Sequence, residues 1–314
     1  MYAIGIDLGG TNIVAGVVDD NYNLLSLAKC KTVSSRSAEE IIDDMAAMAR
    51  EATEKAGLLL RDIAHIGVGC PGTCNPYTGE VEYANNLPFS HIALGPILKE
   101  KLGLPVYIEN DANAAAIGEM KAGAAKGAES CVCITLGTGV GGGVIIDGKV
   151  FSGFNFSGTE LGHTVIVANG EACTCGRNGC WEAYASATAL INQTRRAMED
   201  HPESKMWEIA ESLDKVNGLT AFDAMRAGDA VGKAVVDAYI GYVGCGLTNM
   251  VNIFQPEVLC IGGGICKEGE TLLAPLRAIV ERERYSKYSE KQTRLCVAEL
   301  GNDAGVIGAA ALGR

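Results

Sequence analysis

The sequence has no excess of basic side chains, and this absence excludes several kinds of partner. It contains 26 Lys and Arg against 38 Asp and Glu, which gives a formal net charge of −12 over 314 residues. A chain with this balance lacks the cationic surface that binding to nucleic acid or to an anionic membrane requires. Small phosphate-bearing ligands remain possible, because backbone N–H groups and a divalent cation can neutralise a phosphate without lysine.

Targeting and membrane-spanning segments are also missing. Residues 1–10, MYAIGIDLGG, contain no basic leader and no apolar core with a cleavage site. No apolar run approaches the length that a transmembrane helix needs. The 12 cysteines then fit a reducing compartment, so we expect a cytoplasmic protein. Nine of them are expected to be small buried residues: Cys30, Cys70, Cys74, Cys131, Cys133, Cys245, Cys260, Cys266 and Cys296.

Glycine, in contrast, is abundant, with 40 residues that cluster at the ends of apolar runs. Glycine at such places allows tight turns and a close approach of the backbone to a ligand. Apolar periodicity and turn residues predict strands that alternate with helices, which is typical of a layered α/β fold. We expect strands at 2–8, 11–19, 63–69, 105–109, 258–261 and 294–299, and helices at 37–57, from 111, at 184–199, 206–213, 229–254, 270–283 and 301–312.

The helix after residue 36 has the clearest start signal. Ser37 is followed three residues later by Glu40, the spacing of a capping box. Apolar residues at helical spacing follow, and Gly57 is expected to end the helix.

A weak internal repeat suggests two related lobes. Residues 4–20 and 132–148 superpose at a constant offset of 128, and both predict a strand, a Gly-rich turn and a second strand. We expect an N-terminal lobe at 1–115, on which the closing segment 301–314 packs back, and a C-terminal lobe at 116–300. No low-complexity linker separates the two lobes.

The Gly-rich turns are better explained as phosphate-binding hairpins than as a dinucleotide fold. Residues 137–142 satisfy GxGxxG, but the residues that follow, VIIDGKV, predict a strand where a Rossmann fold needs a helix. Small residues let successive N–H groups face phosphate oxygens, and Thr138 adds a hydroxyl. The turn at 7–11, DLGGT, can act in the same way, with Asp7 as a candidate for holding Mg²⁺ through water. The alternative for Asp7 is a turn-forming aspartate at a strand end.

The segment 160–182 contains a cluster of thiols beside one of only four histidines. Three thiolates and one imidazole form a closed tetrahedral set, as in structural zinc sites. A disulfide between neighbours this close is disfavoured, and redox or unliganded thiols are the remaining alternatives. The four candidate ligands are His163, Cys173, Cys175 and Cys180.

Acidic residues stand at both ends of this segment, Glu160 and Glu182. A loop that folds around a metal can hold such carboxylates rigidly against a polyol. The imidazole nitrogen of His163 that does not bind zinc is free to meet a substrate hydroxyl. The segment therefore suggests a sugar-handling enzyme with zinc as a scaffold.

The catalytic candidate is Asp111, at a predicted strand-to-helix junction. Its position at or near the N-cap is expected to favour the ionised form, because the helix dipole and free N–H groups stabilise a negative charge. An ionised carboxylate can accept the proton of a substrate hydroxyl that attacks a phosphoryl group. Asn110 beside it can both donate to and accept from sugar hydroxyls. The alternative for Asp111 is an ordinary helix cap.

Together these motifs resemble the ROK family of sugar kinases and sugar-responsive repressors. The matching segments span most of the chain and keep the family order; they are DLGGT (7–11), PGTCNPYTG (71–79), NDAN (110–113), LGTGVGGG (136–143), ELGH (160–163) and CTCGRNGCWE (173–182). The resemblance implies an actin-like, two-lobed fold of the hexokinase superfamily, with ribonuclease H-like lobes. It also implies ATP and Mg²⁺ as cosubstrates and a hexose, with glucose as the first choice, phosphorylated at its 6-hydroxyl.

The resemblance assigns roles to single residues. Asp111 matches the catalytic base of the family. Its sugar-binding residues match Asn110, Glu160, His163 and Glu182, with Gly72 and Asn85 as additions. Its zinc ligands match His163, Cys173, Cys175 and Cys180. The nucleotide side is matched by Gly9, Gly10, Thr11, Gly137, Thr138 and Gly139, and by Gly263 and Gly264 near the adenosine.

Several alternatives stay open from the sequence. The sugar could be N-acetylmannosamine, N-acetylglucosamine, mannose, allose or fructose, and polyphosphate could replace ATP. A non-catalytic sugar sensor and a zinc-dependent hydrolase are less consistent with the intact NDAN segment and with the two glycine hairpins. DLGGT begins seven residues from Met1, which is not expected to leave room for the DNA-binding module of family repressors. The resemblance suggests a homodimer or homotetramer.

Overall fold

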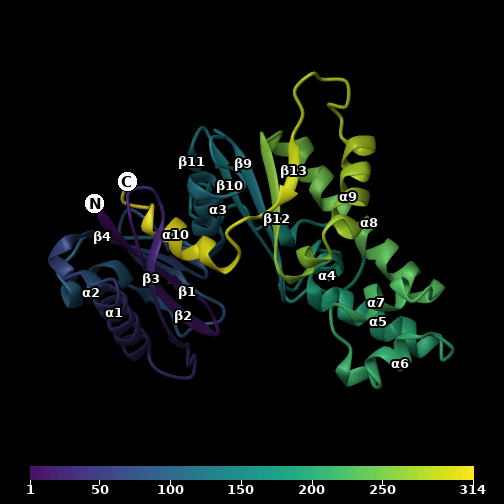
Figure 1. Ribbon diagram of the computed structural model, residues 1–314, viewed down its shortest axis with the longest axis horizontal. Helices are drawn as coiled ribbons and strands as arrows, with labels where there is room; N and C mark the ends of the chain where they lie inside the picture. Colours follow the sequence, from purple (N-terminus) through teal and green to yellow (C-terminus); the bar gives the residue numbers. More distant parts are fainter. The chain divides into compact units, whose positions relative to one another are not determined.

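The computed structural model describes residues 1–314 and contains three β-sheets (Figure 1). The first has the strand order β3 (Leu24–Lys31), β2 (Asn12–Val18), β1 (Tyr2–Leu8), β4 (Ile63–Cys70) and β8 (Val106–Asn110). The second has the order β11 (Lys149–Val150), β10 (Val140–Ile146), β9 (Cys131–Leu136), β12 (Val258–Gly262) and β13 (Arg294–Val297). A small antiparallel sheet consists of β5 (Thr73–Asn75), β6 (Glu80–Tyr83) and β7 (Ser90–Ile92).

The two five-stranded sheets have the same strand order, which confirms the repeat seen in the sequence. In the first sheet, β1 pairs antiparallel with β2 and parallel with β4, and β4 pairs parallel with β8. In the second sheet, β10 pairs antiparallel with β11, and β12 pairs parallel with β13. Each sheet therefore combines a meander of three strands with two further strands that enter through helical connections.

The chain divides into two compact units. Unit 1 consists of residues 1–133, 143–159 and 298–314, and unit 2 consists of residues 134–142 and 160–297. The chain thus passes from one unit to the other within β9 and within β10. The lobe boundary expected after residue 115 stays a prediction. In the division into compact units, residues 116–133 belong to the first unit.

In unit 1 the central strand β1 separates two apolar layers. Ile4, Ile6 and Leu8 are buried in one layer together with residues of α1 (Ala38–Lys55) and α2 (Leu94–Leu102). Ala3 lies in the other layer with Ile307 of α10 (Ala304–Ala310), which also packs on α3 (Asp111–Ala122). Alternating side chains point to opposite faces of a strand, so β1 is covered on both sides.

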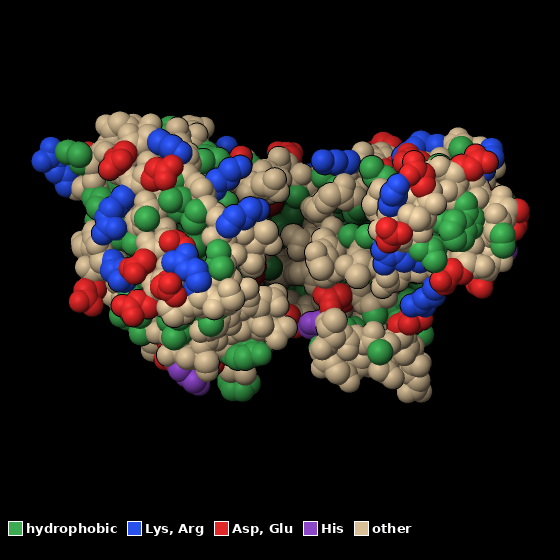
Figure 2. All heavy atoms as spheres, turned by 90° about the horizontal axis from the view of Figure 1, so that it is seen from below, with side chains coloured by type: hydrophobic (Ala, Val, Ile, Leu, Met, Phe, Trp, Pro, Cys, Tyr) green, Lys and Arg blue, Asp and Glu red, His purple; other side chains and the backbone are tan.

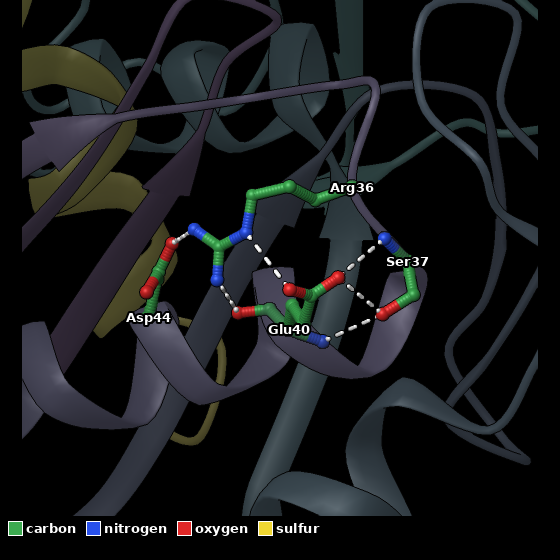
Figure 3. A network of polar contacts seen from close by, with 4 residues as sticks. All are labelled: Arg36, Ser37, Glu40 and Asp44. Carbon is green, nitrogen blue, oxygen red and sulfur yellow. Dashed lines mark hydrogen bonds and ion pairs between the residues drawn. The ribbon is translucent and has the colours of Figure 1, made fainter.

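The start of α1 has the predicted capping box (Figure 3). The Ser37 hydroxyl accepts a hydrogen bond from the Glu40 N–H, at 3.3 Å, and the Glu40 carboxylate accepts from the Ser37 N–H, at 2.9 Å. Arg36 donates to Glu40 and, at 2.6 Å, to Asp44 one turn further along the helix. These contacts satisfy N–H groups that a helix start leaves without a partner.

Unit 2 contains most of the helices, and two of its predicted helices are wrong in extent. The single helix expected at 184–199 is two helices, because Ser186 has an extended backbone and its side chain caps the Ala189 N–H. The helix expected at 206–213 ends at Ala210. The helices are α4 (Glu182–Ala185), α5 (Ala187–Asp200), α6 (Met206–Ala210), α7 (Thr220–Arg226), α8 (Ala230–Phe254) and α9 (Glu270–Glu283).

Short 3-10 helices complete the secondary structure. One of them replaces the first turn of the closing helix expected at 301–312, whose α-helical part begins only at Ala304. They are η1 (Leu60–Asp62), η2 (Leu161–His163), η3 (Leu213–Lys215), η4 (Gly264–Glu268) and η5 (Gly301–Asp303).

Helix α8 is long and apolar enough to cross a membrane by length and composition alone, contrary to the expectation that no segment reaches this length. However, 61% of its apolar window is buried within the protein. It packs against α7 and α9, and Val243, Leu247 and Val251 on its buried side are fully covered. A core helix needs this apolar surface for packing, so its composition alone is weak evidence for a membrane. On the face shown in Figure 2, acidic and basic side chains are interspersed.

Candidate functional site

The junction between β8 and α3 positions the catalytic candidate in unit 1. Asn110 is the N-cap of α3, and its side chain accepts hydrogen bonds from the N–H groups of Ala112, at 2.9 Å, and Asn113, at 3.2 Å. Its amide nitrogen donates to the carbonyl oxygen of Gly72, at 3.2 Å. The hydrogen bonds to the helix start and to Gly72 therefore fix Asn110, the residue that precedes Asp111.

Asp111 is the first residue of α3, and its Oδ1 accepts a hydrogen bond from the Ala112 N–H at 2.9 Å. Burial raises the pKa of its carboxyl group, although the Ala112 N–H acts in the opposite direction. The expectation that the helix start favours the ionised form is therefore wrong in its net result, because the loss of water outweighs the N–H groups. A carboxylate with a raised pKa is a stronger base once it has lost its proton.

Glu109 and Asn113 support this junction, and the sequence motifs did not identify them as a pair. Glu109 is buried, and its Oε1 accepts from the Asn110 N–H at 2.9 Å and from the Asn113 amide at 3.0 Å. Burial raises the pKa of Glu109. The sequence signal that could have identified this pair was a glutamate near the end of a predicted strand, Glu109, followed four residues later by Asn113. Both side chains act on the cap rather than directly on Asp111.

Asp7 faces the same part of unit 1 from β1, where it pairs with Val14 of β2. Burial, and secondly the negative charge of Asp111, raise the pKa of Asp7 to about 6. The charge of Asp111 therefore lies close enough to disfavour the ionised form of Asp7. A divalent cation would relieve this repulsion, which fits the expected role of Asp7.

The first Gly-rich turn follows Asp7 directly. Gly9 donates its N–H to the carbonyl oxygen of Asn12, at 2.9 Å, and accepts from the Thr32 hydroxyl, at 2.7 Å. Gly10 and Thr11 are exposed at the tip. The turn is thus fixed at its base and open at its tip, as a phosphate-binding hairpin requires.

The two additional sugar-site candidates lie beside the small sheet of unit 1. Gly72 has a φ of +95°, and a Cβ atom there would lie 2.1 Å from the carbonyl oxygen of Tyr83. Only glycine fits this close approach of the backbone to β6. Asn85 is exposed and accepts a hydrogen bond from the Tyr83 hydroxyl at 3.2 Å. The structure brings Gly72 to Asn110 and leaves Asn85 on the neighbouring loop.

In unit 2 the expected metal ligands come together although they lie on separate segments. One potential ligand atom of each of the four residues lies within 4.8 Å of the others. Nδ1 of His163 lies 3.6 Å from Sγ of Cys173, and Sγ of Cys175 lies 3.6 Å from Sγ of Cys180. Sulfur ligands at about 2.3 Å from a tetrahedral zinc ion lie about 3.8 Å apart, so this donor set fits the metal.

The thiols of this cluster need a positive charge to ionise together. Burial and the neighbouring thiols raise the pKa of Cys180 to about 12, whereas a hydrogen bond from the Arg177 N–H lowers the pKa of Cys175. The loop is held in place by Arg177, which donates to the carbonyl oxygen of His163 at 3.1 Å. Since Nδ1 of His163 faces Cys173, Nε2 remains for another partner.

The second Gly-rich turn lies between β9 and β10 in the same unit, and a strand follows it as expected. Its carbonyl groups are fixed by the start of α5: the Ala187 N–H donates to Gly137 and the Thr188 hydroxyl donates to Thr138, each at 2.8 Å. No hydrogen bond is present at the N–H groups of Thr138 and Gly139. These two donors are therefore available to phosphate oxygens.

The remaining candidates of unit 2 lie around this turn. Gly263 has a φ of +107° and packs on Leu136, where a Cβ atom would lie 2.1 Å from the carbonyl oxygen. Gly264 begins η4 directly after it. Glu160 precedes η2, which carries His163. Glu182 begins α4, and its carboxylate accepts a hydrogen bond from the Val140 N–H at 3.0 Å.

Comparison with protein families matches residues 3–314 to the model described as the ROK family. Among known proteins, the chain is 37% identical to a glucokinase of Streptomyces coelicolor, over 99% of this chain and 97% of the relative. It is 36% identical to a glucokinase of Thermotoga maritima, with 98% and 96% covered.

Among solved structures, the chain is similar to a ROK family glucokinase from Streptomyces griseus in complex with glucose and AMPPNP. The TM-score is 0.82 at 36% identity, and the match covers 99% of each chain. This likeness confirms the expected fold class, the actin-like α/β fold of two lobes.

The raised pKa of Asp7 predicts a pH-dependent stability. The folded state keeps a proton on Asp7 between about pH 4 and 6 that the unfolded state loses, so the free energy of unfolding falls as the pH rises through this window. Asp7→Asn removes the ionisation. We expect the variant to exceed the wild type by about 1–3 kcal/mol in unfolding free energy at pH 7.5, and the difference to shrink near pH 4. Urea unfolding without added divalent cations measures both values.

The matched control for this prediction is Asp214→Asn, the same change at an exposed position of unit 2. It is expected to change the unfolding free energy by less than about 0.5 kcal/mol at either pH. A difference for Asp7→Asn that stays constant from pH 4 to 7.5 would mean that Asp7 does not titrate in this range.

Proposed function

Because the chain belongs to the ROK family, we infer that it is a kinase that transfers the γ-phosphoryl group of ATP to glucose. The observation that carries this conclusion is its likeness, at 36% identity over 99% of both chains, to a glucokinase structure that holds glucose and AMPPNP. AMPPNP is an analogue of ATP, so that protein binds both the sugar and the nucleotide.

We propose that Asp111 acts as the general base at the 6-hydroxyl of the sugar. As the oxygen of this hydroxyl forms a bond to the γ-phosphorus, the bond from phosphorus to the leaving oxygen of ADP breaks, and the hydroxyl proton passes to the Asp111 carboxylate. Burial raises the pKa of this group, which strengthens it as a base. The Asn110 cap and the Glu109 hydrogen bonds hold the helix start in place during this step.

We propose sugar-binding roles for three residues in each unit. In unit 1 these are Asn110, Gly72 and Asn85, and the bond between the Asn110 amide and the Gly72 carbonyl supports a shared role for the first two. In unit 2 they are Glu160, His163 and Glu182. Carboxylates and the free imidazole nitrogen can each form hydrogen bonds with sugar hydroxyls.

The nucleotide phosphates are proposed to bind at the two Gly-rich turns. The open N–H groups of Thr138 and Gly139 and the exposed tip at Gly10 and Thr11 support this assignment. Gly263 and Gly264 are proposed to lie on the adenosine side. Asp7 would hold Mg²⁺, whose charge would neutralise the phosphates.

The Cys3His cluster is proposed to bind a structural zinc ion. The four ligand atoms lie within 4.8 Å of one another, close enough for one ion to bind all four, and the closed donor set would leave no open position for catalysis. A bound zinc ion would stabilise the loop as thiolate ligands replace thiols. The ligands would be His163, Cys173, Cys175 and Cys180.

A cytoplasmic location and a homodimer or homotetramer are further proposals. Cysteines without disulfides support the location. The family resemblance supports the assembly, and light scattering of the purified protein would distinguish a dimer, a tetramer and a monomer.

Asp111→Asn should lower glucose turnover by about 10²–10⁴-fold, because asparagine cannot accept the proton. Glucose affinity should change little, since the amide keeps a similar size and hydrogen-bonding capacity. A coupled assay with ATP measures turnover, and calorimetry measures glucose binding. Asp214→Asn is the matched control and should behave as the wild type in both. Unchanged turnover of Asp111→Asn would remove Asp111 from the role of base.

The same coupled assay decides the open alternatives. A panel of mannose, fructose, allose, N-acetylmannosamine and N-acetylglucosamine, each with ATP and with polyphosphate, should show the highest kcat/KM for glucose with ATP. A higher kcat/KM with another sugar would make that sugar the substrate in place of glucose, and a higher kcat/KM with polyphosphate would make polyphosphate the phosphoryl donor in place of ATP. Glucose binding without turnover of any sugar would instead indicate a sensor.

The zinc proposal predicts about one zinc ion per purified chain. Cys175→Ser should lower both the zinc content and the affinity for glucose, because serine is a poor zinc ligand and the loop loses its order. Mass spectrometry of the metal and calorimetry measure these two quantities. Cys245→Ser, at a half-buried cysteine outside the cluster, should change neither. A zinc-free wild type with full activity would contradict the scaffold role.

A further inference from the structure

The carboxylate of Glu182 lies between the Cys/His cluster and the second Gly-rich turn, all within unit 2. Its Oε2 accepts a hydrogen bond from the Val140 N–H at 3.0 Å. Its Oε1 accepts from the Thr174 hydroxyl at 3.3 Å and lies 3.8 Å from Sγ of Cys173. One side chain thus joins the hairpin of residues 137–140, here called the phosphate hairpin, to the loop of residues 173–180, here called the cluster loop.

Gly139 lies directly beside the Glu182 carboxylate, which occupies the space that a side chain at position 139 would need. A Cβ atom at Gly139 would lie 2.3 Å from Oε2 of Glu182, whereas a Cβ atom at Gly137 would meet no atom within 4 Å. Position 139 does not have the left-handed backbone that favours glycine. A side chain at position 139 would therefore displace the Glu182 carboxylate, while the backbone conformation itself does not require glycine.

The backbone at Glu182 is held in place by its neighbours, and this restricts the positions that its carboxylate can reach. Trp181, the preceding residue, is fully buried, and its indole N–H donates to the carbonyl oxygen of Tyr242 in α8 at 2.9 Å. Cys180, one residue earlier, belongs to the cluster. The position of Glu182 therefore depends on the core below it and on the cluster beside it.

The phosphate hairpin is held from two directions. The start of α5 binds the carbonyl groups of Gly137 and Thr138, and Glu182 binds the N–H of Val140 on the returning strand. The open N–H groups of Thr138 and Gly139 lie between these fixed points. A shift of the Glu182 carboxylate would therefore change the geometry of the open donors without unfolding the hairpin.

We propose that Glu182 couples the metal cluster to the phosphate hairpin, so that zinc and nucleotide each strengthen the binding of the other. A metal bound to Cys173 would order the neighbouring Thr174, which orients the Glu182 carboxylate, which in turn positions Val140. Such coupling is reciprocal, since the two binding free energies share one interaction term. The inference rests on the proposed zinc and phosphate sites and assigns Glu182 a positioning role in addition to sugar binding.

Competition for zinc at equilibrium tests the coupling without sugar and without turnover. The zinc-loaded protein is mixed with a chromophoric chelator, with or without AMPPNP and Mg²⁺, and the zinc dissociation constant is obtained from the zinc that each retains at equilibrium. For the wild type we expect the nucleotide to lower the zinc dissociation constant by about tenfold, within the usual range of coupling between sites. The same nucleotide added to chelator and free zinc corrects for metal that the nucleotide itself binds.

Two variants should abolish this effect by different routes. Glu182→Ala removes the carboxylate, and Gly139→Ala displaces it while all four cluster residues and Glu182 are kept. With each variant saturated with AMPPNP, the ratio of the zinc dissociation constants without and with nucleotide should fall to about one in both. Glu171→Gln is the matched control, because Glu171 precedes the cluster loop but pairs with Arg196 at 2.6 Å. It should keep the wild-type ratio.

The outcomes separate the coupling from the function on which it rests. If Glu182→Ala fails to hold zinc, Gly139→Ala decides the result. A wild-type protein that binds zinc and AMPPNP but shows a ratio of one would overturn the coupling and leave the proposed sites intact. A ratio that stays at the wild-type value in Gly139→Ala and Glu182→Ala would exclude Glu182 as the link. Failure of the wild type to bind zinc or AMPPNP at all would contradict the proposed sites themselves.

Discussion

The burial of a carboxylate at the start of α3 is the constraint on which the arrangement of the β8–α3 junction depends. Asp111 loses water there, and the hydrogen bonds from Ala112, Asn110 and its own N–H only partly replace it. The surrounding chain therefore provides a rigid frame: Asn110 caps the helix, Glu109 holds the cap, and Gly72 accepts the amide of Asn110. A base that is costly to ionise is a strong base, so the same burial that disfavours the charge supports the proposed role of Asp111 in proton abstraction.

In unit 2 the corresponding constraint is the placement of several loops around the proposed phosphate site in an acidic chain. Its phosphate hairpin has open N–H groups and no lysine, so its geometry must come from hydrogen bonds to its other atoms. The break in the helix at Ser186 contributes to this geometry. It leaves the Ala187 N–H at the start of a new helix, where it donates to the carbonyl oxygen of Gly137. The cluster loop contributes through Glu182, whose hydrogen bonds to Val140 and Thr174 make the proposed metal site part of the same framework.

Local signals in the sequence predicted local structure well. The capping box at Ser37, the strand after the second glycine turn, α8 and α9 all follow from spacing over a few residues. The grouping of the four cluster residues was predictable because thiols crowded beside glycines have few other uses. The repeat predicted two related lobes because both copies share one hairpin pattern, and the two five-stranded sheets have the same strand order.

What depends on distant parts of the chain was not predictable in this way. The direction of the Asp111 pKa follows from burial by elements that lie far away in sequence. Strand β3, helix α2 and the small sheet of β5, β6 and β7 lie in segments without a clear period, and their pairing partners decide their structure. Gly139 was assigned to phosphate binding, but its contact with Glu182 joins residues 43 positions apart, which no motif spacing reveals.

The central claim is that one buried aspartate takes the proton of the sugar hydroxyl that is phosphorylated. A crystal structure with glucose and AMPPNP bound measures this most directly, as the distance from the Asp111 carboxylate to the 6-hydroxyl oxygen of glucose. If Asp111 is the base, this distance should be about 2.6–3.2 Å, the range of a hydrogen bond along which the proton can pass. Glucose bound in an ordered position with its 6-hydroxyl beside another side chain, and with Asp111 out of reach, would contradict it.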